Sequence, residues 1–287
     1  MFHLCLLLLA LLPQEVDRPL PDKTGFLEAF RNHLHTPNKL LSQYTYTEKE
    51  TERKRDSKGN VTWSETNVYQ VINGAEDWQS YRRHISKNGV PLSEKELEKQ
   101  DRKERERVEK EQRRRVGWSE AKKEQEKAKS EREEREETDD IFATFNYELV
   151  RRELIDGVST ILVNFTPKKN YGPKTRDAKQ LQHVSGRIWI SEDDHELVKL
   201  QAEVMEPIKI GAGLLAKVQE GSTLAFELRK INDEIWLPVK GEMSLSGKLF
   251  LVKGWNVEVS VEFSEHKKFN VDTILDVAKP VERDDLR

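Results

Sequence analysis

A run of 44 residues, Glu94 to Glu137, is almost entirely charged and cannot contribute to a hydrophobic core. It holds 16 acidic and 16 basic residues. On both sides of it the sequence returns to an alternation of apolar and polar residues that is typical of half-buried β-strands. The run therefore interrupts a β-rich chain of 287 residues, and the two flanking parts are expected to build the core.

Four interpretations of this charged run are a nucleic-acid-binding arm, a disordered linker, a coiled coil and a solvated helix. Acidic residues alternate with the basic ones, and the chain has a net charge of −3, so nucleic-acid binding is disfavoured. The few apolar residues keep no heptad, which disfavours a coiled coil. Acid-first pairs four residues apart, such as Glu106 and Lys110, favour a helix. We therefore expect a solvated, mostly helical excursion.

This excursion is expected to contain two helices. Ser93 and Glu96 have the spacing of a capping box, so the first helix should begin there. Gly117 marks a break, and Ser119 is placed to cap a second helix. We expect an antiparallel helical hairpin that returns the chain to the sheet it left, and that either contacts a partner or is a tolerated insertion.

The sequence predicts a leader before the fold. The apolar run Leu4–Leu12 is too short to span a bilayer and matches the apolar core of a secretory signal, so export to the periplasm is expected. The single cysteine, Cys5, lies inside this run, so the mature chain is expected to form no disulfide. The predicted segments are 1–21, signal peptide and linker; 22–92, first part of a β-barrel domain; 93–139, charged helical insertion; 140–270, second part of the barrel; and 271–287, C-terminal tail.

The β-barrel parts begin with an amphipathic helix that carries Phe26, Phe30 and Leu34 at helical spacing, with Thr24 available as its N-cap. Long alternating strands follow, joined by turns such as Asp156-Gly157. About nine to eleven strands are expected. The pattern predicts a mainly β fold with α: an open or incomplete antiparallel β-barrel wrapped around a helix, with a long charged helical insertion.

No catalytic signature is present: the sequence lacks G-x-S-x-G, H-E-x-x-H, a P-loop and G-x-G-x-x-G. Its seven histidines are scattered. The polar stretch SEDDHE (191–196) is expected to be a solvated hairpin turn rather than a metal site. We therefore expect a protein that is not an enzyme and that has no cofactor and no metal.

What remains is an apolar interior, since a sheet with one dry face must cover it with a helix, a second sheet or a ligand. The segment 207–221 is apolar and flanked by glycine, and suits either a mobile loop at a cavity mouth, with Ile210, Leu214 and Leu215, or a short strand with a bulge. The residues expected to line a ligand cavity are Phe26, Phe30, Val163, Phe165, Val198, Leu200, Leu224, Phe226, Leu228, Val257, Val259, Val261 and Phe263.

The leading helix, the hairpin GRIWISEDDHELVKLQAEV (186–204) and the later stretch NDEIWLPVKGEMSLSG (232–247) together resemble the lipoprotein-carrier superfamily. That group includes the LolA- and LolB-type outer-membrane lipoprotein-sorting proteins and the RseB-type envelope-stress regulators. The resemblance covers roughly 22–92 and 140–268, with the charged run as an insertion. It implies an incomplete barrel, capped by helices, whose cavity holds acyl chains and performs no reaction.

The sequence therefore predicts a non-enzymatic periplasmic protein that binds lipids or lipoproteins in an apolar cavity, as an outer-membrane lipoprotein-sorting carrier would. Its expected partners are lipid acyl chains or lipoproteins and no nucleic acid, and the chain is expected to be a monomer. The alternative is an envelope scaffold or stress sensor whose charged helices, residues 94–137, bind a protein partner.

Overall fold

The computed structural model describes residues 18–36, 38–210, 216–249 and 253–269. The α-helices are α1 (Lys23–Leu34), α2 (Glu94–Val116), α3 (Glu120–Thr144) and α4 (Arg176–Leu181), and two short 3₁₀ helices are η2 (Leu41–Gln43) and η3 (Asp77–Gln79). The strands are β1 (Tyr44–Arg55), β2 (Val61–Ile72), β3 (Tyr81–Lys87), β4 (Val90–Pro91), β5 (Phe145–Ile155), β6 (Val158–Pro167), β7 (Val184–Ser191), β8 (Leu197–Val204), β9 (Ile208–Ile210), β10 (Ala216–Val218), β11 (Thr223–Ile231), β12 (Ile235–Leu249) and β13 (Lys253–Lys268). The expected signal run Leu4–Leu12 and the tail 271–287 lie outside the described residues.

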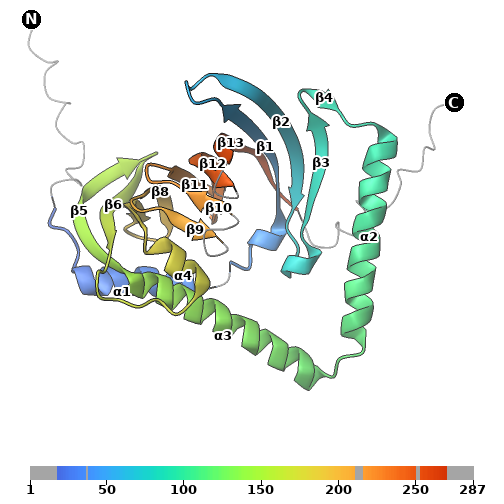
Figure 1. The fold of residues 1–287 in the computed structure, drawn as a ribbon. Helices are drawn as coiled ribbons and strands as arrows, with labels where there is room; N and C mark the ends of the chain where they lie inside the picture. The colour runs from blue at the N-terminus through green and yellow to red at the C-terminus, as the bar shows by residue number, and fades with distance from the viewer. Residues whose placement is uncertain (1–17, 37, 211–215, 250–252, 270–287) are drawn as a thin grey trace, which may run out of the picture.

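One antiparallel sheet contains all thirteen strands of the described chain (Figure 1). Neighbouring strands follow the order β4-β3-β2-β1-β13-β12-β11-β8-β7-β6-β5, while β9 and β10 form a small extension beside β12. The two end strands, β4 and β5, are not paired with each other, so the sheet stays open. The expectation of a mainly β fold with an open antiparallel barrel is confirmed.

Helix α1 covers one face of the sheet over β5 to β8, and we call this face the inner face. Phe26 and Phe30 are both 5% exposed and belong to the same buried cluster as Val163 and Phe165 of β6. The helix is capped by Asp22 rather than by Thr24, since the Asp22 carboxylate accepts a hydrogen bond from the Gly25 amide at 2.8 Å. The predicted helix is thus confirmed, with the cap two residues earlier, and its buried stripe includes Phe26 and Phe30 but not Leu34, which is 42% exposed.

A second buried cluster lies on the opposite face, which we call the outer face. It contains Leu162, Trp189, Val198 and Trp236, with Leu228 packed against it. A register shift between Trp189 and Ile190 in the β7–β8 pairing accounts for the position of Val198, because a bulge moves the residues beyond it to the other face. A second shift lies in the β11–β12 pairing, where Glu227 pairs with Lys240 and Leu228 pairs with Pro238, so the extra residue is Val239 of β12.

The charged helices connect the two open edges of the sheet. The capping box of Ser93 and Glu96 and the Ser119 cap are present as predicted. The expected antiparallel hairpin is wrong: α2 and α3 diverge from the turn at Gly117 instead of lying side by side (Figure 1). Helix α2 follows β4 and packs along β3, whereas α3 leads to α1, α4 and β5. Because β4 and β5 are opposite edges, the helices link them outside the sheet.

Hydrogen bonds hold each of the two charged helices, α2 and α3, to its neighbours in the fold. At one end, the Asp101 carboxylate of α2 accepts hydrogen bonds from Arg83 at 2.7 Å and from the Tyr81 hydroxyl at 3.0 Å. At the other end, the buried Asp140 carboxylate of α3 accepts hydrogen bonds from the Tyr171 hydroxyl and the Thr175 amide. Burial raises the pKa of Asp140, but these hydrogen bonds outweigh it and lower the pKa to about 2.

Between these ends, every residue from Glu120 to Glu136 in α3 is exposed. A helix that is polar on all sides is stable as a bridge through solvent when ion pairs along it support the helix. Pairs such as Lys129–Glu133 and Arg132–Glu136, four residues apart, provide that support here. No helix in the described part of the chain is long and apolar enough to cross a membrane.

Candidate functional site

The inner face continues past the edge of α1 as an apolar surface. Leu200 and Ala202 of β8 pack against the core beneath α1, and they pair with Phe226 and Leu224 of β11. Directly paired residues in antiparallel strands share a face, so the same face extends across β11, β12 and β13. We call the following residues the uncovered strip: Leu224, Phe226, Met243, Leu245, Val257, Val259, Val261 and Phe263.

The uncovered strip is far less buried than the core beside it. Leu224 is 38% exposed and Met243 is 36% exposed, whereas Ile161 and Val163 under α1 are fully buried. Among the described helices, α2 packs on β3, α3 packs on β5, and α1 lies over β5 to β8. A contiguous apolar surface that is not covered is the usual mark of a surface for a ligand or a partner.

One end of the strip is formed by Trp255, which pairs with Gly247. A Cβ atom at Gly247 would lie 2.5 Å from the Trp255 ring, so the ring occupies the space that a side chain would need. The Trp255 Nε1 group is buried and has no hydrogen-bond partner in the described part of the chain. This end of the strip is therefore closely packed, and its indole N–H group is buried rather than open to a ligand.

A charged cluster bounds the other side of the strip. Glu48 and Glu50 of β1 pair with Phe263 and Val261, so they lie on the inner face beside the strip. Arg82 of β3 donates hydrogen bonds to Glu48 at 2.6 Å and to Glu50 at 2.9 Å, and its guanidinium lies 3.3 Å from the centre of the Tyr69 ring. The inner face thus changes from apolar to charged within one strand spacing.

The structure brings most of the sequence-predicted cavity residues to one face. Val198 and Leu228 are the exceptions, because they lie in the outer-face cluster. Ile210 ends β9, while Leu214 and Leu215 lie outside the described residues. The residues on the inner face are Phe26, Phe30, Val163, Phe165, Leu200, Leu224, Phe226, Val257, Val259, Val261 and Phe263.

Sequence reasoning missed Met243, Leu245 and Trp255 as members of this face. The signal for the first two is the alternation in the stretch EMSLSG (242–247), where Met243 and Leu245 are the apolar members. For Trp255 the signal is its period of two with Val257 and Val259, which continues the apolar face of β13.

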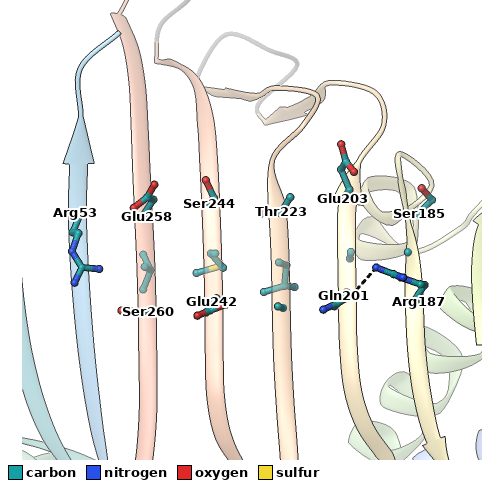
Figure 2. A pocket seen from close by; sticks show the side chains of 16 residues that line it. Arg53, Ser185, Arg187, Gln201, Glu203, Thr223, Glu242, Ser244, Glu258 and Ser260 are labelled. Carbon is teal, nitrogen blue, oxygen red and sulfur yellow. Dashed lines mark hydrogen bonds between the residues drawn. The ribbon is translucent and has the colours of Figure 1, made fainter. Parts of the chain in front are cut away.

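A polar hollow of about 560 Å³ lies across β7, β8, β11, β12, β13 and β1 (Figure 2). Its polar side chains, such as Arg53, Glu242 and Glu258, alternate with the residues of the uncovered strip and so belong to the outer face. Two of its groups are already engaged, because Glu258 binds Arg55 and Arg187 donates to Gln201. It is mixed in charge and open, and we do not assign the ligand site to it.

The polar turn 191–196 has structural contacts. Glu192 accepts hydrogen bonds from the buried Arg152 at 2.7 Å, and this guanidinium also donates to the carbonyl groups of Arg18 and Pro19. The hydrogen bonds with Arg152 lower the pKa of Glu192 to about 2. Within the described residues, no group of three or more His, Cys, Asp or Glu side chains is arranged to hold a metal ion.

The comparisons with known proteins concern the fold. No protein-family model matches the sequence, and no curated protein matches it either. Three solved structures are similar to this chain, and each covers 88% of it. One is a putative outer membrane lipoprotein-sorting protein domain from Vibrio parahaemolyticus, which is 7% identical, is matched over 97% of its own length and has a TM-score of 0.34. Another is a DUF1329 family protein from Desulfovibrio piger, which is 14% identical, is matched over 95% of its length and has a TM-score of 0.32. The third is a LolA superfamily protein from Nitrosomonas europaea, which is 11% identical, is matched over 96% of its length and has a TM-score of 0.29.

Proposed function

We propose that this chain is a non-enzymatic binding protein that holds lipid acyl chains, free or attached to a lipoprotein, on the uncovered strip. The single observation that carries this proposal is that the strip shares its face with the buried core but is not covered. Binding an acyl chain there removes apolar area from water, at about 25 cal/mol per Å² before the costs of association.

The location that goes with this function is the periplasm. The proposal for it rests on the apolar run Leu4–Leu12, which has the length of a secretory signal core. A carrier of acyl chains between membranes needs an apolar surface on which a ligand can bind and from which it can leave. The sheet of this chain is not closed into a barrel, which supports such access to its inner face.

The test compares two lysine substitutions in one strand. Val259→Lys places a charge in the uncovered strip, and Ser260→Lys places the same charge on the outer face. Binding of a fluorescent fatty acid is expected to weaken at least about tenfold in Val259→Lys and to stay unchanged in Ser260→Lys. Lipid mass spectrometry of the full chain purified from its native envelope identifies the ligand. Equal affinities for the two variants would contradict the proposal.

A second candidate function is a scaffold whose charged helices bind a protein partner. It is favoured by the stretch Glu120–Glu136 of α3, which is exposed on every side. Substituting Arg132 and Arg135 by alanine, with fatty-acid binding as the control, tests this candidate. If a partner that binds the wild-type chain no longer binds while fatty-acid binding is retained, the helices carry the interaction. If the partner still binds to the variant, the charged helices do not carry the interaction.

A further inference from the structure

We propose that α4, β9 and β10 form a docking surface for a bilayer that contains anionic phospholipids. A hollow of about 790 Å³ lies between these elements, and five cationic side chains line it: Lys174, Arg176, Lys179, Lys209 and Lys217. We call these five residues the basic surface. The inference rests on the proposed function, because it says from which partner the uncovered strip receives its acyl chains.

The charges of the basic surface are available to an external anion. Lys174, Arg176, Lys179 and Lys209 are exposed, and Lys217 is half-buried. Among the described residues, the ion pair at this hollow is His183 with Glu206, at 3.2 Å, and it does not involve the five cations. The neighbouring acidic residue on α4, Asp177, does not line the hollow. A surface with this excess of positive charge attracts negative charge.

The sequence strengthens the positive charge at this end of the sheet. From Pro207 to Gln219 it contains Lys209 and Lys217 and no acidic residue. From Met243 to Val257 it contains Lys248 and Lys253 and again no acidic residue. Lys217 pairs directly with Lys248, so the two stretches meet in the sheet. Two cations directly opposite each other repel, and an anion bound beside them would reduce this repulsion.

The position of the basic surface relative to the strip selects a bilayer. Val218 of β10 pairs with Gly247 of β12, and Gly247 pairs with Trp255, so β10 lies at the Trp255 end of the uncovered strip, while Lys217, next to Val218, belongs to the opposite face of the sheet. A bilayer presents anionic headgroups and acyl chains together, and the basic surface and the strip would meet it at the same end of the sheet, from opposite faces. A nucleic acid would present phosphates but no acyl chains, and the hollow offers no Phe, Tyr or Trp side chain for stacking bases.

Vesicle sedimentation with the full chain tests the proposal. The chain is expected to bind vesicles of phosphatidylcholine and phosphatidylglycerol, and to bind pure phosphatidylcholine vesicles much more weakly. Raising the salt from about 0.1 M to about 1 M shortens the Debye length from roughly 10 Å to roughly 3 Å and should release the protein. Equal binding to both vesicle types would overturn the proposal, and so would binding to RNA with none to the anionic vesicles.

A matched pair of triple variants locates the effect. One variant carries Arg176→Gln, Lys179→Gln and Lys209→Gln in the basic surface. The control carries Lys127→Gln, Lys129→Gln and Arg132→Gln in the exposed part of α3, with the same change in net charge. Each cation near an anionic bilayer changes affinity roughly fivefold, so the first variant should lose between about tenfold and about 100-fold, and the control less than about twofold. Equal losses would overturn the proposal.

Binding of a fluorescent fatty acid without vesicles separates this proposal from the proposed function. The basic-surface variant is expected to keep fatty-acid binding, and Val259→Lys is expected to keep vesicle binding. If wild-type chain binds anionic vesicles but no fatty acid, the docking surface stands and the carrier function fails. If it binds fatty acid but no anionic vesicles, the carrier function stands and the docking surface fails.

Discussion

The two halves of the inner face have similar strands but different cover. Over β5 to β8 the apolar side chains pack under α1, and residues such as Val163 are fully buried. Over β11 to β13 the side chains are equally apolar, yet Leu224 and Met243 keep more than a third of their surface exposed. The covered half therefore stabilises the fold, and the uncovered half is the surface that we propose for binding. An apolar strand face is not evidence of a core until its cover is known.

The largest effect is expected in the covered half. Phe30→Ala should lower the free energy of unfolding by about 3–5 kcal/mol, because it removes a buried ring and leaves a cavity. Met243→Ala in the uncovered half should cost less than about 1 kcal/mol, because its side chain is already partly in water. Urea denaturation measures both. Similar losses would show that the two halves do not differ as proposed.

The next effect concerns the acid sensitivity of the covered half. Glu192 has a pKa lowered to about 2 by its hydrogen bonds with Arg152, whereas an unfolded Glu has a pKa of about 4.3. Its contribution to stability is therefore complete above about pH 4.5 and is lost as the pH falls toward 2. Glu192→Gln should be less stable than wild type at pH 7, by up to about 3 kcal/mol, since it removes the charged partner of the hydrogen-bonded pair with Arg152.

The measurement for Glu192 is the difference in free energy of unfolding between wild type and variant across pH 7 to pH 2. That difference should shrink as the pH falls through the stated window. Asp156→Asn is the control, because its ion pair with Arg229 is exposed and should contribute little at any pH. A difference that stays constant with pH would contradict the role of Glu192.

A smaller effect is expected in the connection between the sheet edges. Ala128→Gly lies in the fully exposed part of α3 and should destabilise this helix locally by about 1 kcal/mol. Amide hydrogen exchange should become faster between Glu120 and Glu136 and remain unchanged in β5 to β8. Faster exchange in the covered half as well would show that the helix supports the core, and that the connection is not only a bridge.

The smallest effect is expected on the outer face. Ser260→Lys, in the polar hollow of Figure 2, should change the free energy of unfolding by less than about 0.5 kcal/mol. Val259→Lys should also be tolerated, because its side chain is half-buried and Glu52 lies opposite on β1. Circular dichroism during thermal unfolding measures both variants. A large loss in Val259→Lys alone would mean that the strip is core rather than a binding surface.

The sequence predicted much of this arrangement from local chemistry. The capping box at Ser93, the turn at Asp156-Gly157 and the period of two in β13 depend on neighbouring residues alone, and all are present. Val198 and Leu228 were expected on the inner face but pack in the outer-face cluster, and a bulge in β8 accounts for Val198. A bulge depends on the pairing of two strands, so the alternation within one strand does not reveal it.

The geometry of the charged helices and the basic surface required the tertiary structure. Capping predicted the two helices and their break at Gly117, but their directions are set by Asp101 at one edge and Asp140 at the other. The basic surface combines Arg176 of α4 with Lys209 and Lys217, which lie more than thirty residues further along the chain. Such groupings arise from sheet pairing between distant segments, which composition and spacing do not specify.

What the sequence determined by itself is which residues are helical, which are extended and, in strands without a bulge, which face is apolar, because those properties depend on capping groups and on the period of the chain. What only the tertiary structure decided is how much of the apolar face is covered. One twelve-residue helix, α1, is long enough to cover β5 to β8 and not the whole sheet. The remaining strip stays exposed because the charged helices, which have almost no apolar side chains to bury, cannot pack on it.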